Sequence, residues 1–134
     1  KDYLAAYDST MARFWFNNPR ARDLICAELE HEPRGHIVTS EELLRWGCDF
    51  PDHLYGELFF LMNPGILLCP SFMGEKPLAG MHGYSPEDKD SVAAFMTNVP
   101  GITMPRRLDD MYRLMRSEAQ GAAYNTDDTA PPGS

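Results

Sequence analysis

The sequence is short of cysteine, of basic residues and of long apolar runs. Its three cysteines, Cys26, Cys48 and Cys69, are an odd number without a Cys-x-x-Cys spacing, which predicts reduced, buried thiols rather than a disulfide framework or a cysteine zinc site. With 12 Lys and Arg against 20 Asp and Glu, the net charge of −8 disfavours binding to a nucleic-acid polymer. The apolar runs are much shorter than the roughly 18 residues that span a bilayer, so no membrane span is expected.

Several catalytic signatures are missing as well. The sequence contains no phosphate-binding P-loop, no dinucleotide-binding glycine pattern and no serine nucleophile elbow. Of the four histidines, three have ordinary explanations. His31 lies at the expected end of a helix, where an imidazolium favours the helix dipole, whereas His36 begins an expected strand and His53 lies in an acidic loop.

The sequence does contain enough apolar material for a folded core. Hydrophobic residues make up 43% of the 134 residues, alongside 11 prolines and 10 glycines, which predicts one folded, loop-rich domain. The expected fold class is α+β or α/β, with a β-hairpin, a few further strands and about three helices. Residues 1–119 form the expected domain, and residues 120–134, which contain Asp, Pro and Gly but almost no large apolar side chain, are expected to be a tail.

Three segments have helical signals. Asn18 before Pro19 predicts a helix over residues 19–31, because apolar positions then recur at helical spacing. The pair Thr39 and Glu42 has the spacing of a capping box and predicts a second helix that runs to about Trp46 and ends at Gly47. An apolar stripe over residues 106–119 predicts the terminal helix.

The expected strands are rich in aromatic and β-branched residues. Residues 3–16 are predicted as one strand, and residues 36–39 as a short one. Residues 57–62 and 66–69 are predicted to pair as a hairpin around Asn63-Pro64-Gly65, which suits a type II turn. Residues 91–97 fit either a buried strand or a short helix.

Residues 70–86 are expected to form a long irregular loop, a kind of segment that often carries function. Within it, His82 stands between glycines in Gly80-Met81-His82-Gly83-Tyr84, and such flanking lets the backbone turn sharply while it holds one imidazole toward a site. On these residues alone, a structural role and a metal-ligand role for His82 both stay open. The candidate acids and bases, none of which forms a recognisable catalytic pair, are Asp8, Glu57, Glu87, Asp88 and Asp90. The last three are expected in a solvated loop, and Asp109 and Asp110 lie early in the expected terminal helix, where they favour its dipole.

Five segments together resemble the C-terminal part of the alkaline phosphatase superfamily, in its type I phosphodiesterase and nucleotide pyrophosphatase branch. The resemblance extends over roughly residues 3–118 and is carried by residues 11–16 (MARFWF), 55–58 (YGEL), 70–74 (PSFMG), 80–86 (GMHGYSP) and 108–112 (LDDMY). It implies a segment of an alkaline-phosphatase-like fold. It also implies that His82 coordinates one of two catalytic metal ions, usually zinc, in a hydrolase of small phosphodiester or pyrophosphate substrates.

The departures from that family predict an incomplete enzyme. The family uses an aspartate near the start, a Thr or Ser nucleophile and a later Asp-His pair, and this sequence has no Asp-His dipeptide and no recognisable nucleophile. Since each of two metals needs about three protein ligands, His82 alone cannot hold them. The chain, which begins with Lys1, is therefore expected to be a C-terminal fragment, inactive alone, of a metal-dependent hydrolase.

Two other functions remain as alternatives. One is a non-catalytic protein-binding or dimerisation module, with the aromatic first strand and the tail making contacts to neighbouring chains, which would make the protein a homo-oligomer. The other is a small free-standing metal hydrolase that uses His82 with acidic loop residues. A cytoplasmic location is favoured because no signal peptide is visible, with the natural start of the chain expected to be missing.

Overall fold

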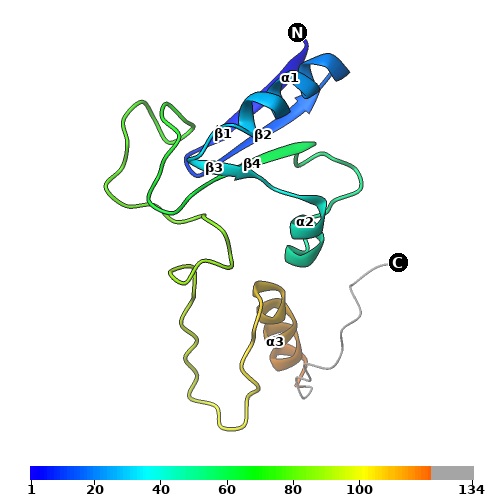
Figure 1. Cartoon of the computed structure of the whole chain (residues 1–134). Coiled ribbons are helices and arrows are strands. Elements are labelled where there is room, and N and C mark those ends of the chain that lie inside the picture. Colours follow the sequence, from blue (N-terminus) through cyan, green and yellow to red (C-terminus); the bar gives the residue numbers. More distant parts are fainter. Residues whose placement is uncertain (122–134) are drawn as a thin grey trace. The chain divides into compact units, whose positions relative to one another are not determined.

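The strands form an antiparallel sheet whose middle members come from distant parts of the sequence (Figure 1). The computed structural model describes residues 1–121, and in that part the sheet has four strands in the order β1-β2-β4-β3. The strands are β1 (Tyr3–Asp8), β2 (Met11–Phe16), β3 (Gly35–Ile37) and β4 (Leu58–Met62). β2 and β4 are therefore the inner strands, and β1 and β3 are the edges.

The two helices near the sheet begin where the sequence predicts. Helix α1 (Pro19–Leu29) is capped by the Asn18 side chain, which accepts a hydrogen bond of 3.0 Å from the Arg20 N–H. Helix α2 (Ser40–Trp46) has the predicted capping box between Thr39 and Glu42. It ends at Gly47, whose left-handed conformation is the usual glycine stop signal.

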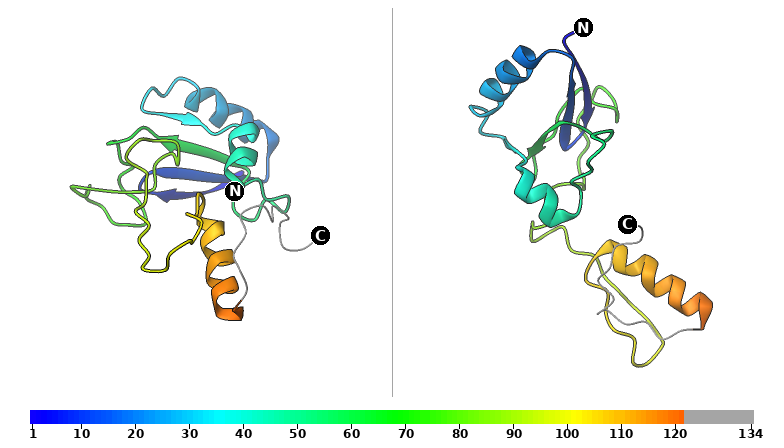
Figure 2. Two further views of the ribbon diagram at one scale, coloured as in Figure 1. Left: turned by 90° about the horizontal axis from the view of Figure 1, so that it is seen from below. Right: turned by 90° about the vertical axis from the view of Figure 1, so that its right-hand side faces the viewer.

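Strand β4 has apolar side chains on both faces, and all five of its residues are buried. Leu58, Phe60 and Met62 lie on the face that packs against α1, in a cluster with Ala12 and Phe14 of β2. On the opposite face, Phe59 and Leu61 pack with Val38 and with Leu43 and Trp46 of α2. A strand that is covered on both faces has a continuous apolar sequence rather than an alternating one. Figure 2 shows α1 and α2 beside the sheet, and their contacts are with opposite faces of β4.

The predicted single strand over residues 3–16 is wrong, because the chain reverses at Ser9 and Thr10. Strands β1 and β2 pair as an antiparallel hairpin, with Asp8 opposite Met11 and Tyr3 opposite Phe16. The polar residues Asp8, Ser9 and Thr10 interrupt the aromatic run, and polar residues of this kind favour turns. The alternation predicted from residue 10 onward is correct within β2, where Ala12, Phe14 and Phe16 share a face.

The predicted hairpin of residues 57–62 with 66–69 is wrong as well. The turn itself is present, since the Ile66 N–H donates to the Asn63 carbonyl at 3.0 Å and Gly65 has a φ of 85°. β4 pairs instead with β2 and β3, which leaves no edge for residues 66–69. These residues run past the β1–β2 turn, where the Leu68 N–H donates to the Ser9 carbonyl at 2.8 Å.

The described chain forms two compact units, the first being Lys1–Val92 and the second beginning at Ala93. The second unit contains the predicted terminal helix, α3 (Leu108–Gln120), which begins two residues later than expected. At its start the Asp110 carboxylate accepts hydrogen bonds of 2.9 Å from the N–H groups of Arg106 and Arg107. Residues 91–97 form neither a strand nor a helix, and the predicted tail lies, from residue 122 onward, outside the described residues.

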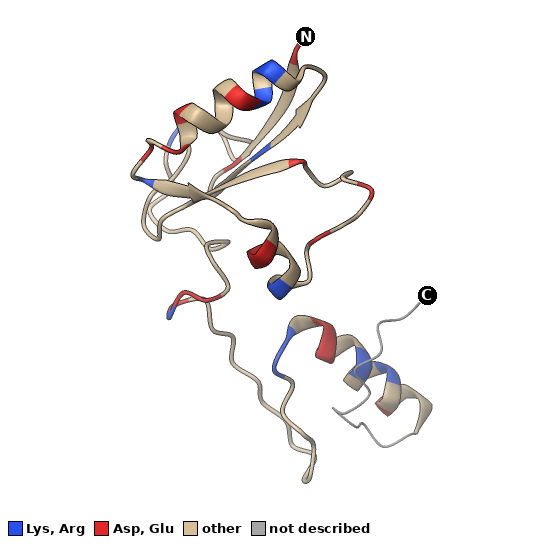
Figure 3. Cartoon of the chain, turned by 45° about the vertical axis from the view of Figure 1, so that its right-hand side comes forward, with Lys and Arg blue, Asp and Glu red and all other residues tan. Residues whose placement is uncertain are grey.

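The described residues thus form a mixed α+β structure of four strands and three helices. Most charged residues lie on the helices and loops, with Asp8 at the end of β1 and Arg13 in β2, whereas β4 consists of apolar residues alone (Figure 3). Over residues 1–121, none of the helices has the length and apolar character needed to cross a bilayer.

Candidate functional site: the loop that carries His82

Residues 70–86 form the irregular loop that the sequence predicts, and its first part is fixed to the β1–β2 hairpin. The Phe72 N–H donates to the Tyr7 carbonyl at 2.9 Å. The hydroxyls of Ser71 and Ser9 share a hydrogen bond of 3.0 Å. A loop without regular structure therefore obtains part of its order from the edge of the sheet.

The second part of the loop, which carries His82, is attached to the same hairpin. The Thr10 hydroxyl donates to the Gly83 carbonyl at 2.8 Å, and Gly83 has a φ of 95°, a conformation that glycine adopts without strain. Tyr84 packs against the core cluster around Phe14, and its hydroxyl donates to the Ile66 carbonyl at 3.2 Å. The two residues that follow His82 are thus held by contacts with the folded sheet.

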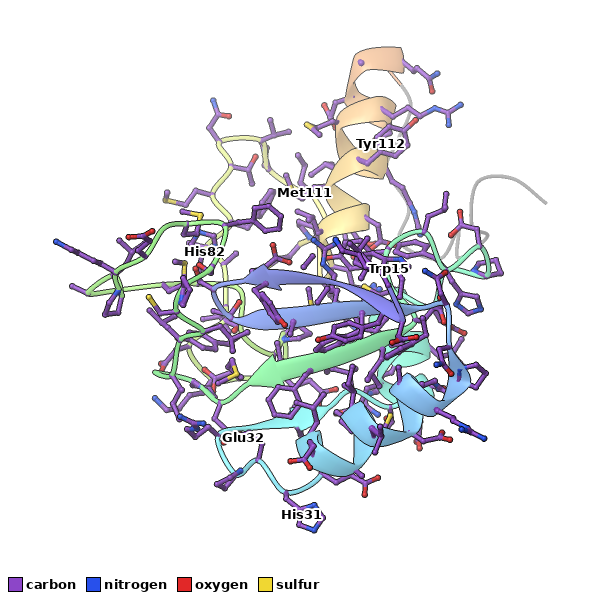
Figure 4. All side chains as sticks on the ribbon, turned by 90° about the horizontal axis from the view of Figure 1, so that it is seen from above. Trp15, His31, Glu32, His82, Met111 and Tyr112 are labelled. Atoms are coloured by element: carbon purple, nitrogen blue, oxygen red, sulfur yellow. The ribbon has the colours of Figure 1, made fainter. Side chains whose placement is uncertain are left out.

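The His82 imidazole is exposed and faces an open hollow of about 660 Å³. Within residues 1–121, no group forms a hydrogen bond or ion pair with its ring, so both ring nitrogens are accessible. Figure 4 shows His82 beside the hairpin, well away from His31. The hollow is lined by loop residues, including Leu78, Met81 and His82, and by residues on either side of the loop, including Leu67, Asp88 and Asp90.

The donor atoms near His82 are too few for a complete metal site. The described part of the chain contains no group of three His, Cys, Asp or Glu side chains arranged to hold a metal ion. A catalytic zinc ion takes three protein ligands and keeps one position for water or substrate. His82 suits a zinc ion as one ligand, and the remaining ligands would have to come from residues beyond those described.

Two of the other histidines have partners at the ring, whereas the contact of His53 is made by its backbone. The Nδ1 atom of His31 lies 2.7 Å from the Ala27 carbonyl oxygen at the end of α1, in agreement with the predicted position at a helix end. The Nε2 atom of His36 lies 3.4 Å from a Glu42 carboxylate oxygen. His53 accepts a hydrogen bond at its backbone carbonyl from the indole N–H of Trp15, at 3.0 Å.

The candidate carboxylates are likewise engaged in local contacts. Asp8 binds Arg13 at 3.0 Å, and Glu57 accepts a hydrogen bond of 3.3 Å from the Phe16 N–H. Glu87 accepts hydrogen bonds from Arg45 at 2.6 Å and from the Trp46 indole at 3.2 Å. These bonds, that from Arg45 foremost, lower the pKa of Glu87 below its ordinary value.

The four remaining carboxylates also have partners, which for Asp110 are the N–H groups of Arg106 and Arg107 described above. Asp88 accepts from the Asp90 N–H at 2.9 Å, and the Asp90 carboxylate in turn binds Lys89 at 2.8 Å. Asp109 binds Arg107 and Arg113, each at 3.1 Å. The contacts of the candidate carboxylates therefore point to roles in loop and helix structure.

Two segments that carry the family resemblance, residues 11–16 and 55–58, lie side by side in the sheet region. The Arg13 guanidinium lies 4.5 Å from the centre of the Tyr55 ring, and it donates to the Tyr55 carbonyl at 3.3 Å. A cation placed over an aromatic face in this way is attracted by the ring quadrupole. The two segments therefore stabilise each other, which gives both of them a structural role.

The cysteines are unpaired, as predicted, but they are less buried than expected. Cys26 and Cys48 are half-buried, and Cys69 is exposed. Cys69 lies directly before the long loop rather than in a second hairpin strand, which explains its exposure.

The sequence reasoning missed Ser9 and Thr10. Both side chains are buried, with 7% and 6% of their surface exposed, and both hold the loop. The signal that could have found them is the short polar step Asp8-Ser9-Thr10 between two aromatic segments, which indicates a turn.

Comparison with known proteins found no match to this chain. It matches no protein-family model, no curated protein and no solved structure.

Proposed function

We propose that this chain is the C-terminal part of a metal-dependent hydrolase of phosphodiesters or pyrophosphates, similar to the type I phosphodiesterase and nucleotide pyrophosphatase branch of the alkaline phosphatase superfamily. The His82 imidazole is one ligand in a metal centre of two zinc ions. Residues outside this chain supply the other ligands and the nucleophile. The chain alone is inactive. We also propose that the complete protein has an alkaline-phosphatase-like fold. In that fold the sheet of this chain would support the loop that carries His82.

The observation that carries the proposal is the setting of His82. Its ring is exposed and, within residues 1–121, without a hydrogen-bond partner, yet Gly83 and Tyr84 directly after it are fixed to the sheet. A surface histidine without a role needs no such attachment of its backbone. A ligand needs it, because neutral imidazole must present one nitrogen to the metal in a fixed direction.

In this proposal the zinc ions and the chain contribute differently to the reaction. When bound, zinc polarises a phosphoryl oxygen and stabilises the charge that develops on it. The role of this chain is to present the His82 imidazole to the metal. The hollow beside His82 contributes apolar walls, including Leu67 and Met81, against which part of a substrate could pack.

The test is the replacement His82→Ala in the longer protein that contains this chain, with His31→Ala as the matched control. His31 is a histidine of the same unit that is occupied at the end of α1. Metal content by mass spectrometry and hydrolysis of a nitrophenyl phosphodiester are measured for both variants. The proposal expects His82→Ala to lose zinc and hydrolysis, and His31→Ala to keep both. Full zinc content and full hydrolysis in His82→Ala would refute it.

The size of the native protein provides a second test. An antibody against this chain, applied to extracts of the source cells, should detect a product well above the mass of 134 residues. A native product of this size would refute the proposal, since one histidine cannot assemble the centre.

A non-catalytic binding module is the second candidate, and the edge strand β1 is the observation that favours it. β1 is the outer strand of the sheet, and it exposes Tyr3, Leu4 and Tyr7, with Phe72 of the loop 77% exposed nearby. Exposed edge strands with apolar side chains are templates for pairing with a second chain. Under this candidate the chain forms a homo-oligomer, which light scattering would detect and which Leu4→Lys would disrupt. A strictly monomeric chain would exclude it.

A further inference from the structure

Helix α3 carries apolar side chains on two of its sides. Leu114 is buried, with 5% of its surface exposed, and Met111 is half-buried. In contrast, Leu108, Tyr112 and Met115 are 88%, 58% and 60% exposed. Leu114 follows Tyr112 by two residues and therefore lies about 200° away from it around the helix. The helix thus has one buried apolar side and a second apolar side that is exposed.

The exposed apolar side is a continuous row. Leu108, Tyr112, Met115 and Ala119 follow one another at spacings of four, three and four residues, which places them in one line along the helix. These four residues are called the α3 stripe below. Single exposed apolar side chains are normal on a protein surface, whereas a contiguous patch of them typically marks a contact site.

Two residues of opposite charge border the α3 stripe on the same side. Asp109 and Arg116 each follow a residue of the stripe directly, so both lie about 100° around the helix from it. Asp109 is bound by Arg107 and Arg113, yet its side chain stays 52% exposed. Arg116 is exposed and forms no hydrogen bond or ion pair within residues 1–121. Both charges are therefore accessible to a partner that covers the stripe.

The stripe is complementary to a second copy of itself in antiparallel orientation. A two-fold axis between Tyr112 and Met115 places Tyr112 of each copy level with the partner's Met115, and contacts between sulfur and an aromatic ring are favourable. The same axis places Leu108 level with the partner's Ala119, so that a large side chain meets a small one. The four residues thus pair along the whole stripe.

The flanking charges select the same orientation. In the antiparallel pair, Asp109 of each copy lies within one helical turn of the partner's Arg116, and this pair of opposite charges occurs twice. A parallel pair would separate the same two residues by about two turns, or about 10 Å along the helix. Complementary charges of this kind determine register and orientation.

We infer that the α3 stripe is a self-association surface, through which two copies of this chain pair as antiparallel helices. The stripe is only about three turns long. The interface is therefore smaller than the roughly 1,600 Å² of a standard stable interface, and the dimer is weak and depends on concentration. Neither His82 nor a metal takes part, and the surface differs from the exposed edge strand β1.

Sedimentation equilibrium of the full chain over a wide range of concentration tests this pairing. The average mass should rise from 15.2 kDa, the mass of one chain, toward twice that value. Met115→Lys should weaken self-association at least about tenfold, because it places a charge at the centre of the stripe, and Tyr112→Lys is a second variant with the same expectation. Both residues are exposed and lysine is a good helix former, so circular dichroism should show that the variants keep their fold.

Leu24→Lys is the matched control, because Leu24 is a 69% exposed apolar residue of another helix, α1. It should leave self-association unchanged, and so should Leu4→Lys on β1. A mass of one chain at every concentration, or an equal effect of Leu24→Lys and Met115→Lys, would overturn the inference. A dimer that is lost in Leu4→Lys and kept in Met115→Lys would also overturn it and assign the contact to β1. A monomeric chain that co-sediments with vesicles of phosphatidylcholine and phosphatidylserine would overturn it in favour of a lipid surface.

The orientation is tested by exchanging the flanking charges. Arg116→Glu and Asp109→Lys each bring like charges together in a self-paired dimer and should weaken it several-fold, a modest effect because exposed ion pairs contribute little. A mixture of the two variants should associate as the unmodified chain does, because every flanking pair in the mixed dimer is again of opposite charge. A mixture that associates no better than the separate variants would refute the antiparallel pairing.

Discussion

Phe60 is the most buried residue of β4, so its truncation should reveal how much the first unit depends on this strand. Only 2% of its surface is exposed, and its ring lies in the cluster that joins β2, β4 and α1. Phe60→Ala removes most of an aromatic side chain and leaves a cavity between the sheet and the helix. The lost burial and the cavity act in the same direction, because packed neighbours relax only in part.

The expected cost is about 3 to 5 kcal/mol of the free energy of unfolding, the range for buried Phe→Ala changes. Small domains are stable by only about 5 to 15 kcal/mol, so the variant should lose a large share of its stability. Urea unfolding of the full chain, followed by far-ultraviolet circular dichroism and tryptophan fluorescence, measures this cost. Trp46 packs against the opposite face of β4, so its fluorescence, measured with Trp15 replaced by Phe, reports whether both faces unfold together.

Phe72→Ala is the control, because the Phe72 side chain is 77% exposed. It removes the same atoms with little lost burial and should change the free energy of unfolding by no more than about 0.5 kcal/mol. A Phe60→Ala cost near about 1 kcal/mol, the average for an arbitrary substitution, would refute the reasoning. So would an equal cost for the two variants, since burial is the difference between them.

Two further changes test the surface contacts of the first unit. Thr39→Ala removes the capping box of α2 and should cost about 1 kcal/mol in urea unfolding, whereas Thr39→Ser should keep most of the stability; equal values for the two would contradict the cap. Hydrogen bonds from the Arg34 side chain and backbone lower the pKa of Glu32 to about 2. Because this pKa is depressed in the folded state, the stabilisation is present above the ordinary carboxyl pKa and is lost as the pH falls toward 2. Carboxyl carbon resonance titration should find the low midpoint, with a return toward about 4.3 in Arg34→Ala; an ordinary midpoint in the unmodified chain would show that the contact does not form in solution.

The helices were predictable from the sequence because their signals are local. Asn18 before Pro19, Thr39 with Glu42, and Gly47 each act within one helical turn, and each occurs where it was expected. The terminal helix was predictable from the spacing of its apolar residues, with an error of two residues at its start. The turn at Asn63 also depends on neighbours in sequence and was predicted correctly.

Strand pairing was not predictable in the same way, because it depends on partners that are distant in sequence. Residues 66–69 are as apolar as a strand and follow a suitable turn, yet β2 and β3 already occupy both edges of β4. The site shows the same limit. His82 could be singled out by its flanking glycines, but its attachment through Thr10 joins residues at opposite ends of the first unit and leaves no local pattern.

The position of β4 between β2 and β3 has a consequence for the order in which the chain folds. The hairpin of β1 and β2 forms from neighbours in sequence, but an isolated two-stranded hairpin is marginally stable in water. The free edge of β2 pairs with β4, with Met11 opposite Leu61. This pairing can form only after α1, β3 and α2 have been synthesised. The chain loses conformational entropy when it closes so long a loop, and it does so before the stabilising contacts between β2 and β4 form. This cost slows folding. On the ribosome, the aromatic hairpin therefore waits with an unpaired edge until residues 58–62 emerge, and that interval is when the nascent chain is most exposed to aggregation.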